Sequence, residues 1–227
     1  MIIGSQKKVK GKCINLLINN ANINQVNVCK YLGVYIDSCL TWDTQVDNLC
    51  KSTVKNLYLL KRIRHCITQE TALLFYKTIA QSKLDYCDIV WNNTKKQNIQ
   101  RLQILQNRLL KTVLSVENRY PTHLIYESLS LDTLEQRRNK HLLCWMYKVA
   151  TNLTPDYLTR MFELKYSSYN LRNILQNFSL PRIKTCFKKK SFSYQGAKLW
   201  NNLNADAKSK PTYESFKRSL NHYLRQI

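Results

Sequence analysis

Apolar side chains that recur every three or four residues dominate the middle of the chain and favour a helical fold. One stripe runs from Val46 to Ile63 and a second from Ile99 to Val113, with lysine and arginine mostly between their members. Because one face of an α-helix returns about every 3.6 residues, each stripe predicts a helix with one buried side.

Thr68 is a suitable N-cap for a further helix that runs to about Lys83. These three helices predict a three-helix bundle over residues 42–115. Residues 116–227 predict a helical C-terminal region with an extended basic segment near 164–192. Short helices are expected at 122–129, 155–162, 193–203 and 212–226. A longer helix is expected to begin at Asp132, where Asp132 and Glu135 have the spacing of a capping box.

The first 41 residues have a different pattern. Two alternating runs flank a turn at 19–22, and a β-rich run follows from Lys30 to Ile36. We therefore expect a β-hairpin plus a strand. The predicted fold is mainly α with a small N-terminal antiparallel β element, divided into domains at 1–41, 42–115 and 116–227.

The charge of the chain is strongly positive and unevenly distributed. The 36 basic and 14 acidic residues give a formal charge of +22. Residues 51–120 carry 13 basic and 4 acidic side chains, and residues 181–227 carry 11 and 2. Two concentrated basic blocks are typical of a phosphate-binding surface. Since Lys, Asn, Ile and Tyr all have A/T-rich codons, drift in base composition is the alternative explanation.

Several other classes of protein find no support. The eight cysteines include no pair two to four residues apart, so no structural zinc site is expected, and His141 with Cys144 is interpreted as two packed side chains. No apolar run is long enough to cross a bilayer, and the basic start lacks the apolar core of a signal peptide. We expect an intracellular protein of the nucleus or cytoplasm, neither secreted nor membrane-spanning.

Seven short stretches of the sequence follow one another in a distinctive order. They are Met1–Ser5, Val28–Asp37, Leu40–Trp42, Leu59–Arg64, Leu84–Trp91, Leu102–Arg108 and Lys190–Asn201. Each stretch is weak evidence alone, but their succession is specific. Together they resemble the C-terminal third of reverse transcriptases from non-LTR (LINE-type, Jockey/CR1-like) retrotransposons.

The resemblance implies a polymerase whose catalytic aspartates lie in the palm, where they hold two divalent ions. This chain contains no Asp-Asp doublet, and the resemblance places its start just downstream of the catalytic hairpin. We therefore expect no catalytic residues, no metal ligands and no cofactor, although the parent enzyme would use Mg²⁺. Asp85 and Asp88 are interpreted as capping or solvated groups.

By resemblance, residues 30–36 correspond to the last palm strand near the primer grip, and the three-helix bundle corresponds to the thumb. Gly33 has two equal interpretations, close approach of a sugar-phosphate backbone or packing under a neighbouring ring. A thumb binds a template–primer hybrid through shape and positive charge. The candidate nucleic-acid-binding residues are Lys30, Gly33, Lys51, Lys55, Lys61, Arg62, Arg64, Lys95, Lys96, Arg101, Arg108, Lys188, Lys189 and Lys190.

The run from Phe187 to Tyr194 mixes cations with aromatic rings. This composition suits stacking on bases and binding of phosphates, a nuclear-localisation-like patch, or aromatic side chains docked on the domain beside a solvated basic loop. Docked aromatic side chains are the favoured interpretation.

The sequence thus predicts a fragment of an RNA-directed DNA polymerase without catalysis of its own. Its partners would be RNA or an RNA–DNA hybrid, bound without sequence specificity, and the missing fingers–palm portion of the polymerase. The alternative is a helical protein-interaction module whose basic charge is incidental.

Overall fold

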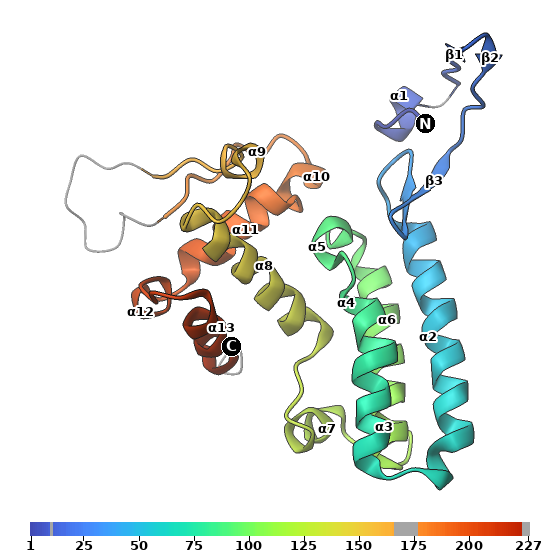
Figure 1. Ribbon diagram of the computed structural model, residues 1–227, viewed down its shortest axis with the longest axis vertical. Helices are drawn as coiled ribbons and strands as arrows, with labels where there is room; N and C mark the ends of the chain where they lie inside the picture. Colours follow the sequence, from blue (N-terminus) through green and yellow to red (C-terminus); the bar gives the residue numbers. More distant parts are fainter. Residues whose placement is uncertain (10, 166–176, 224–227) are drawn as a thin grey trace. The chain divides into compact units, whose positions relative to one another are not determined.

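A computed structural model describes residues 1–9, 11–165 and 177–223 (Figure 1). The chain forms two compact units. The first comprises Met1–Cys87 and Thr94–Ser128, and the second comprises Asp88–Asn93 and Leu129–Ile227. The predicted three-part division at 41/42 and 115/116 remains a prediction. Within the described ranges, no helix combines the length and apolar character that a bilayer crossing requires.

The chain begins with a short helix, α1 (Gln6–Val9), and a small β-hairpin. Strands β1 (Leu17–Ile18) and β2 (Ala21–Asn22) pair in antiparallel register. Asn19 and Asn20 connect them with φ values of 49° and 60°, a left-handed conformation that asparagine tolerates and that two-residue hairpin turns require. The predicted turn at this position is therefore present.

A second hairpin replaces the single strand expected over residues 30–36. Strand β3 (Val28–Tyr31) pairs antiparallel with β4 (Val34–Asp37). Leu32 and Gly33 have φ values of 45° and 82°, so the chain reverses between them. The β-rich composition indicated a strand, but periodicity could not locate this reversal inside it.

The longest helix of the first unit is α2 (Asp43–Ile63), directly after the second hairpin. The carboxylate of Asp37 accepts hydrogen bonds from the backbone N–H groups of Cys39, Thr41 and Trp42, which fixes the entry into the helix. The predicted apolar stripe of α2 faces inward, since Val46, Leu57 and Leu60 are buried.

The second helix of the bundle has three parts. A 3₁₀ turn, η1 (Arg64–Cys66), leads to α3 (Gln69–Phe75), a π-helical segment η2 (Tyr76–Gln81) and α4 (Ser82–Asp85). The hydroxyl of Thr68 accepts a hydrogen bond from the Thr71 N–H at 3.3 Å, which confirms the predicted cap.

Helix α6 (Lys96–Leu114) completes the three-helix bundle and packs along α2 (Figure 1). Leu102, Leu109 and Val113 are fully buried, as its apolar stripe predicted. Helix α7 (Thr122–Ser128) packs on α6 and ends the first unit.

The second unit is built on α8 (Leu134–Ala150), against which α5 (Asp88–Trp91) also packs. Its capping box is formed by Thr133 and Gln136, one residue later than expected. The helical period predicts an inward stripe of Leu134, His141, Leu142, Trp145 and Val149. Leu134, Leu142 and Val149 are buried as expected, but the inward position of Trp145 is wrong, because this ring is 37% exposed.

The remaining helices of the second unit are short. They are α9 (Asp156–Thr159), α10 (Cys186–Lys189), α11 (Phe192–Asn202), α12 (Ala205–Lys208) and α13 (Tyr213–Tyr223). Trp200 and Phe216 lie at the centre of their aromatic core with ring centroids 5.9 Å apart. Much of the expected extended segment, residues 166–176, lies outside the described residues, and the expected extension at 186–189 is a helix instead.

Candidate nucleic-acid interface

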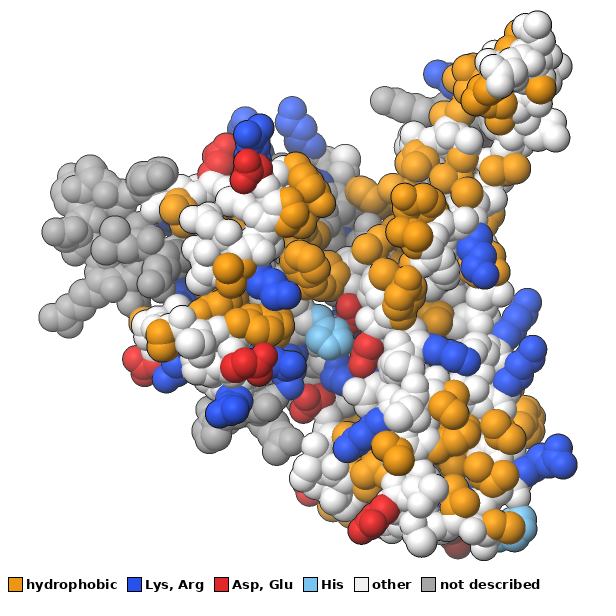
Figure 2. Space-filling view, in the orientation of Figure 1, with side chains coloured by type: hydrophobic (Ala, Val, Ile, Leu, Met, Phe, Trp, Pro, Cys, Tyr) orange, Lys and Arg blue, Asp and Glu red, His pale blue; other side chains and the backbone are white. Residues whose placement is uncertain are grey.

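An exposed stripe of cations follows the outer side of α2. Lys51, Lys55 and Arg62 are exposed and lie within about 40° of one another around the helix axis. Tyr58 falls on the same stripe and is 64% exposed. Beyond Asp47 the helix carries no acidic residue. Figure 2 shows lysine and arginine side chains along α2. In the described part of the chain, the three cations have no hydrogen-bond or ion-pair partner for their side chains.

Two of the predicted cations are paired instead with acidic residues at the start of α2. Lys95 forms an ion pair with Asp43 at 2.7 Å, and Arg101 forms one with Asp47 at 2.8 Å. The hydrogen bond from Lys95 lowers the pKa of Asp43, and the bond to Asp47 raises the pKa of Arg101. Both pairs are about half exposed, so each contributes little stability, about 0–1 kcal/mol. Their positive charge is nevertheless largely offset.

Arg64 has a structural position at the end of α2. Its Nε donates to the carbonyl oxygens of Thr112 and Val113 at 3.2 and 3.1 Å, and one terminal nitrogen donates to Ile67 at 2.9 Å. The two Nε bonds reach carbonyl groups in the last turn of α6, where the Thr112 carbonyl also accepts from the backbone N–H of Ser115 at 3.2 Å. These contacts engage the guanidinium of Arg64 within the fold and give it a structural role.

Two further predicted residues lie in the second hairpin. Lys30 is exposed on β3, with its Nζ 5.5 Å from the centroid of the Tyr35 ring. A Cβ added at Gly33 would meet the Tyr86 ring at 3.5 Å, and the Tyr86 hydroxyl donates to the Leu32 carbonyl at 2.7 Å. Gly33 therefore packs against a neighbouring ring, which is one of its two predicted roles. The other role, close approach of a nucleic-acid backbone, stays a prediction.

A groove of about 500 Å³ lies between α2 and α6 and reaches the start of α7. Lys61 lines it from α2, and Arg108 and Lys111 line it from α6. Lys111 was not among the predicted binding residues, nor was Tyr58, which also lines the groove. Their spacing offered a signal, because each lies three residues from a predicted cation, Arg108 and Lys61 respectively, on the same helix face.

Lys96 is exposed in the first turn of α6, away from the groove lining. The three lysines of the C-terminal run belong to the second unit. Lys188 donates to the hydroxyl of Ser193 at 3.2 Å, while Lys189 and Lys190 are exposed.

The aromatic side chains of that run differ in environment. Phe192 packs edge-on against Phe162, with ring centroids 5.3 Å apart. Phe187 remains exposed. The docked arrangement therefore holds for Phe192 and not for Phe187.

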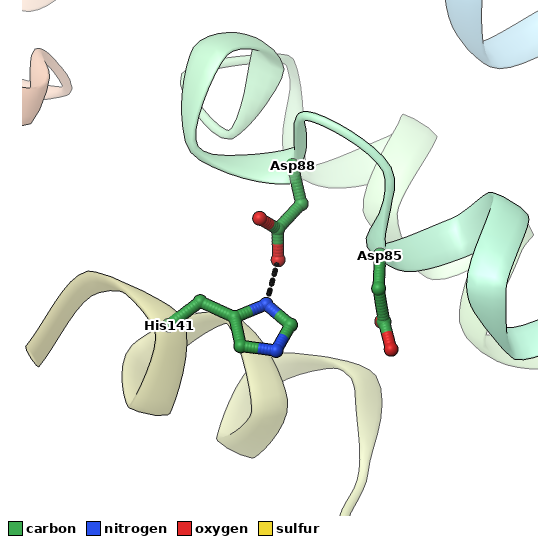
Figure 3. A group of neighbouring side chains, drawn as sticks. All are labelled: Asp85, Asp88 and His141. Atoms are coloured by element: carbon green, nitrogen blue, oxygen red, sulfur yellow. Dashed lines mark hydrogen bonds and ion pairs between the residues drawn. The ribbon is translucent and has the colours of Figure 1, made fainter. Parts of the chain in front are cut away.

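The expected solvated or capping role of Asp88 is wrong. Asp88 is 3% exposed, and its Oδ2 lies 2.6 Å from Nδ1 of His141 within the second unit (Figure 3). A buried carboxylate needs such a partner, because desolvation without one is costly. Asp85, at the end of α4 in the first unit, is half-buried.

Burial raises the pKa of the Cys144 thiol, in line with the packed interpretation of that residue.

Comparison with known proteins finds a relative that is encoded by a transposon. Over 127 residues the chain is 27% identical to the probable RNA-directed DNA polymerase from transposon X-element of Drosophila melanogaster. The matched region of the chain is therefore related to the reverse transcriptases of non-LTR retrotransposons. The similarity covers 55% of this chain and 14% of the Drosophila protein. No family model and no solved structure matches the chain.

Proposed function

We propose that this reverse-transcriptase-related chain is a C-terminal, thumb-containing part of a retrotransposon polymerase. In this proposal its three-helix bundle binds the backbone of RNA or of an RNA–DNA hybrid. Binding would be independent of sequence, because lysine and arginine that contact phosphates carry no information about the bases.

The observation that carries the proposal is the cation stripe of α2. Lys51, Lys55 and Arg62 are exposed, share one side of α2 and have no acidic neighbour on that helix after Asp47. Successive members lie about one or two turns apart, so they present charge along a line, as a phosphate backbone does. Neutralising phosphates with such cations releases condensed counterions, which is the main source of non-specific affinity.

The proposal includes no catalysis by this chain alone. Its sequence has no Asp-Asp doublet to hold the two Mg²⁺ ions on which the parent family depends. Nucleotide addition would need the fingers–palm portion of a polymerase, which would supply the carboxylates.

A protein-binding role is the second candidate, and the first hairpin favours it. Leu16, Leu17 and Ile18 are all more than half exposed, and Figure 2 shows apolar side chains over β1 and β2. Exposed apolar patches of this kind are typical of protein contacts. Under the proposal, the occupant of this patch is the fingers–palm portion of the polymerase.

A salt titration of the purified chain tests the binding proposal. If six to ten phosphates are neutralised, affinity for a 20-residue RNA or for an RNA–DNA hybrid falls by about 10³–10⁵ between 50 and 200 mM salt. Fluorescence anisotropy measures this change. An affinity that is flat across that range would contradict the proposal and favour the protein-interaction module.

A further inference from the structure

The groove between α2 and α6 combines positive charge with apolar surface. Among the residues that the structure describes, its lining includes Lys61, Arg108 and Lys111 and no carboxylate. Its volume of about 500 Å³ falls within the range of about 300–1,000 Å³ that is usual for small-ligand sites. The site therefore has the size and the charge for an anionic group larger than a single phosphate.

The apolar part of the lining lies beside these cations. Leu57 is buried beneath the groove, whereas Ile104 is 46% exposed and Tyr58 is the exposed ring of the α2 stripe. Aromatic rings beside cations are the usual platform for nucleic-acid bases, because every base has a flat face that can stack. A base resting on Tyr58 and Ile104 would cover apolar surface that is otherwise in water.

Several polar groups of the groove remain able to donate to a ligand. The Oδ1 atom of Asn107 accepts from the Tyr126 hydroxyl at 2.6 Å and from Gln103 at 2.8 Å. Because both bonds go to the oxygen, the amide is oriented, and within the described residues its Nδ2 donor remains for a ligand. Lys111 donates to the Asn118 carbonyl and retains two further N–H donors. The Arg108 guanidinium has no partner in the described ranges and can bind a phosphate in bidentate geometry.

We propose that this groove holds one unpaired nucleotide of a nucleic-acid strand. Its base would lie on Tyr58 and Ile104, and its phosphate would be bound by Lys61, Arg108 and Lys111. A paired base cannot reach this position, because both of its faces are stacked within a duplex. The inference rests on the proposed nucleic-acid binding and extends it from a line of phosphates to one single-stranded subsite.

The test uses the full 227-residue chain and three fluorescent probes of equal length. These are a single-stranded oligouridine, an abasic oligomer with the same phosphodiester backbone, and a blunt RNA–DNA hybrid. Tyr58→Ala should weaken oligouridine binding about tenfold and leave the abasic oligomer unchanged, since only the first probe has bases to stack. Arg108→Ala should weaken both, because both contain the phosphate.

Tyr157→Ala is the matched control, since Tyr157 is a 70% exposed tyrosine on α9 of the second unit. It should change none of the three affinities. Circular dichroism checks that each variant keeps the helical fold.

The outcomes separate the two proposals. Equal affinity of Tyr58→Ala and the wild-type chain for oligouridine would overturn the nucleotide site. If Tyr58→Ala lost as much affinity for the abasic oligomer as for oligouridine, the nucleotide site would likewise be overturned. In both cases salt-dependent binding of the hybrid would leave the proposed function intact. Failure of the wild-type chain to bind any probe would contradict both.

Discussion

At the scale of single residues, a cation can either contact a ligand or hold the fold together. Arg64 and Arg62 lie two residues apart, and their sequence context does not distinguish them. In the structure Arg64 donates to three carbonyl groups, whereas Arg62 is exposed. Arg64 is therefore a structural residue, and Arg62 is a candidate for phosphate binding.

Replacement of Arg64 by alanine should therefore destabilise the bundle. The change leaves the carbonyl groups at the end of α6 without their charged donor, which costs about 1–3 kcal/mol of unfolding free energy. Urea denaturation measures the loss. Arg62→Ala is the matched control and should stay within about 0.5 kcal/mol of the wild-type chain; equal losses for the two variants would refute the assignment.

Tyr213 provides a prediction about pH. Burial, with a further contribution from Cys144, raises the pKa of its hydroxyl from 10.0 to about 12. The unfolded chain therefore releases this proton at lower pH than the folded chain does. The stabilising contribution of neutral Tyr213 is complete below pH 10 and is lost as pH rises toward about 12.

Tyr213→Phe removes this titration. Urea denaturation between pH 9 and pH 11.5 should show stability falling less steeply for the variant than for the wild-type chain. Parallel pH profiles would show that the hydroxyl of Tyr213 does not titrate differently in the folded and unfolded states.

The sequence shows which residues are basic but not which basic side chains are paired with a carboxylate in the folded chain. Lys95 and Arg101 are paired with carboxylates 52 and 54 residues earlier, and no local pattern reveals such contacts. Asp88 was misinterpreted for the same reason, because its partner His141 is 53 residues away. Lys51 and Lys55 needed only the helical period to be placed on the outer side of α2.

At the scale of elements, the long amphipathic helices and the turn at Asn19 and Asn20 were predictable from the sequence, whereas the second chain reversal was not. The stripes of α2 and α6 span several turns each, so tertiary packing could only reinforce them. The reversal at Leu32 and Gly33 depends on two backbone angles and is invisible to periodicity. The π-helical segment η2 likewise interrupts a helix whose overall extent was predicted correctly.

The start of α8 shows how two equivalent patterns compete. Asp132 with Glu135 and Thr133 with Gln136 both have the spacing of a capping box, and the structure uses the second pair. The Thr133 hydroxyl accepts from the Gln136 N–H at 3.3 Å, and the Gln136 side chain accepts from the Thr133 N–H at 2.9 Å.

Thr133→Ala should consequently cost about 1 kcal/mol of unfolding free energy, because the cap loses its acceptor. Glu135→Ala is the comparison and should have a smaller effect, since Glu135 is exposed and takes no part in the observed capping box. Thermal or urea denaturation distinguishes the two variants. A larger loss for Glu135→Ala would favour the capping box of Asp132 and Glu135 instead.

At the scale of the whole molecule, the net charge of +22 does not by itself indicate a function. Drift toward A/T-rich codons would add lysine wherever a surface tolerates it. The exposed side of α2 is such a surface, but codon drift gives no reason for the lack of acidic residues on this helix after Asp47. The pattern of the two charges, and not the net amount, therefore distinguishes the two explanations.

The most direct test compares two triple variants with equal loss of charge. Lys51→Ala, Lys55→Ala and Arg62→Ala together remove the α2 stripe. The control combines Lys77→Ala, Lys198→Ala and Lys217→Ala, which are exposed lysines elsewhere. Affinity for single-stranded RNA is measured against salt concentration for both. We expect the first variant to lose about 2 units of the salt slope, from three phosphate contacts, while the control keeps nearly the wild-type slope. Equal slopes for the two variants would contradict the account.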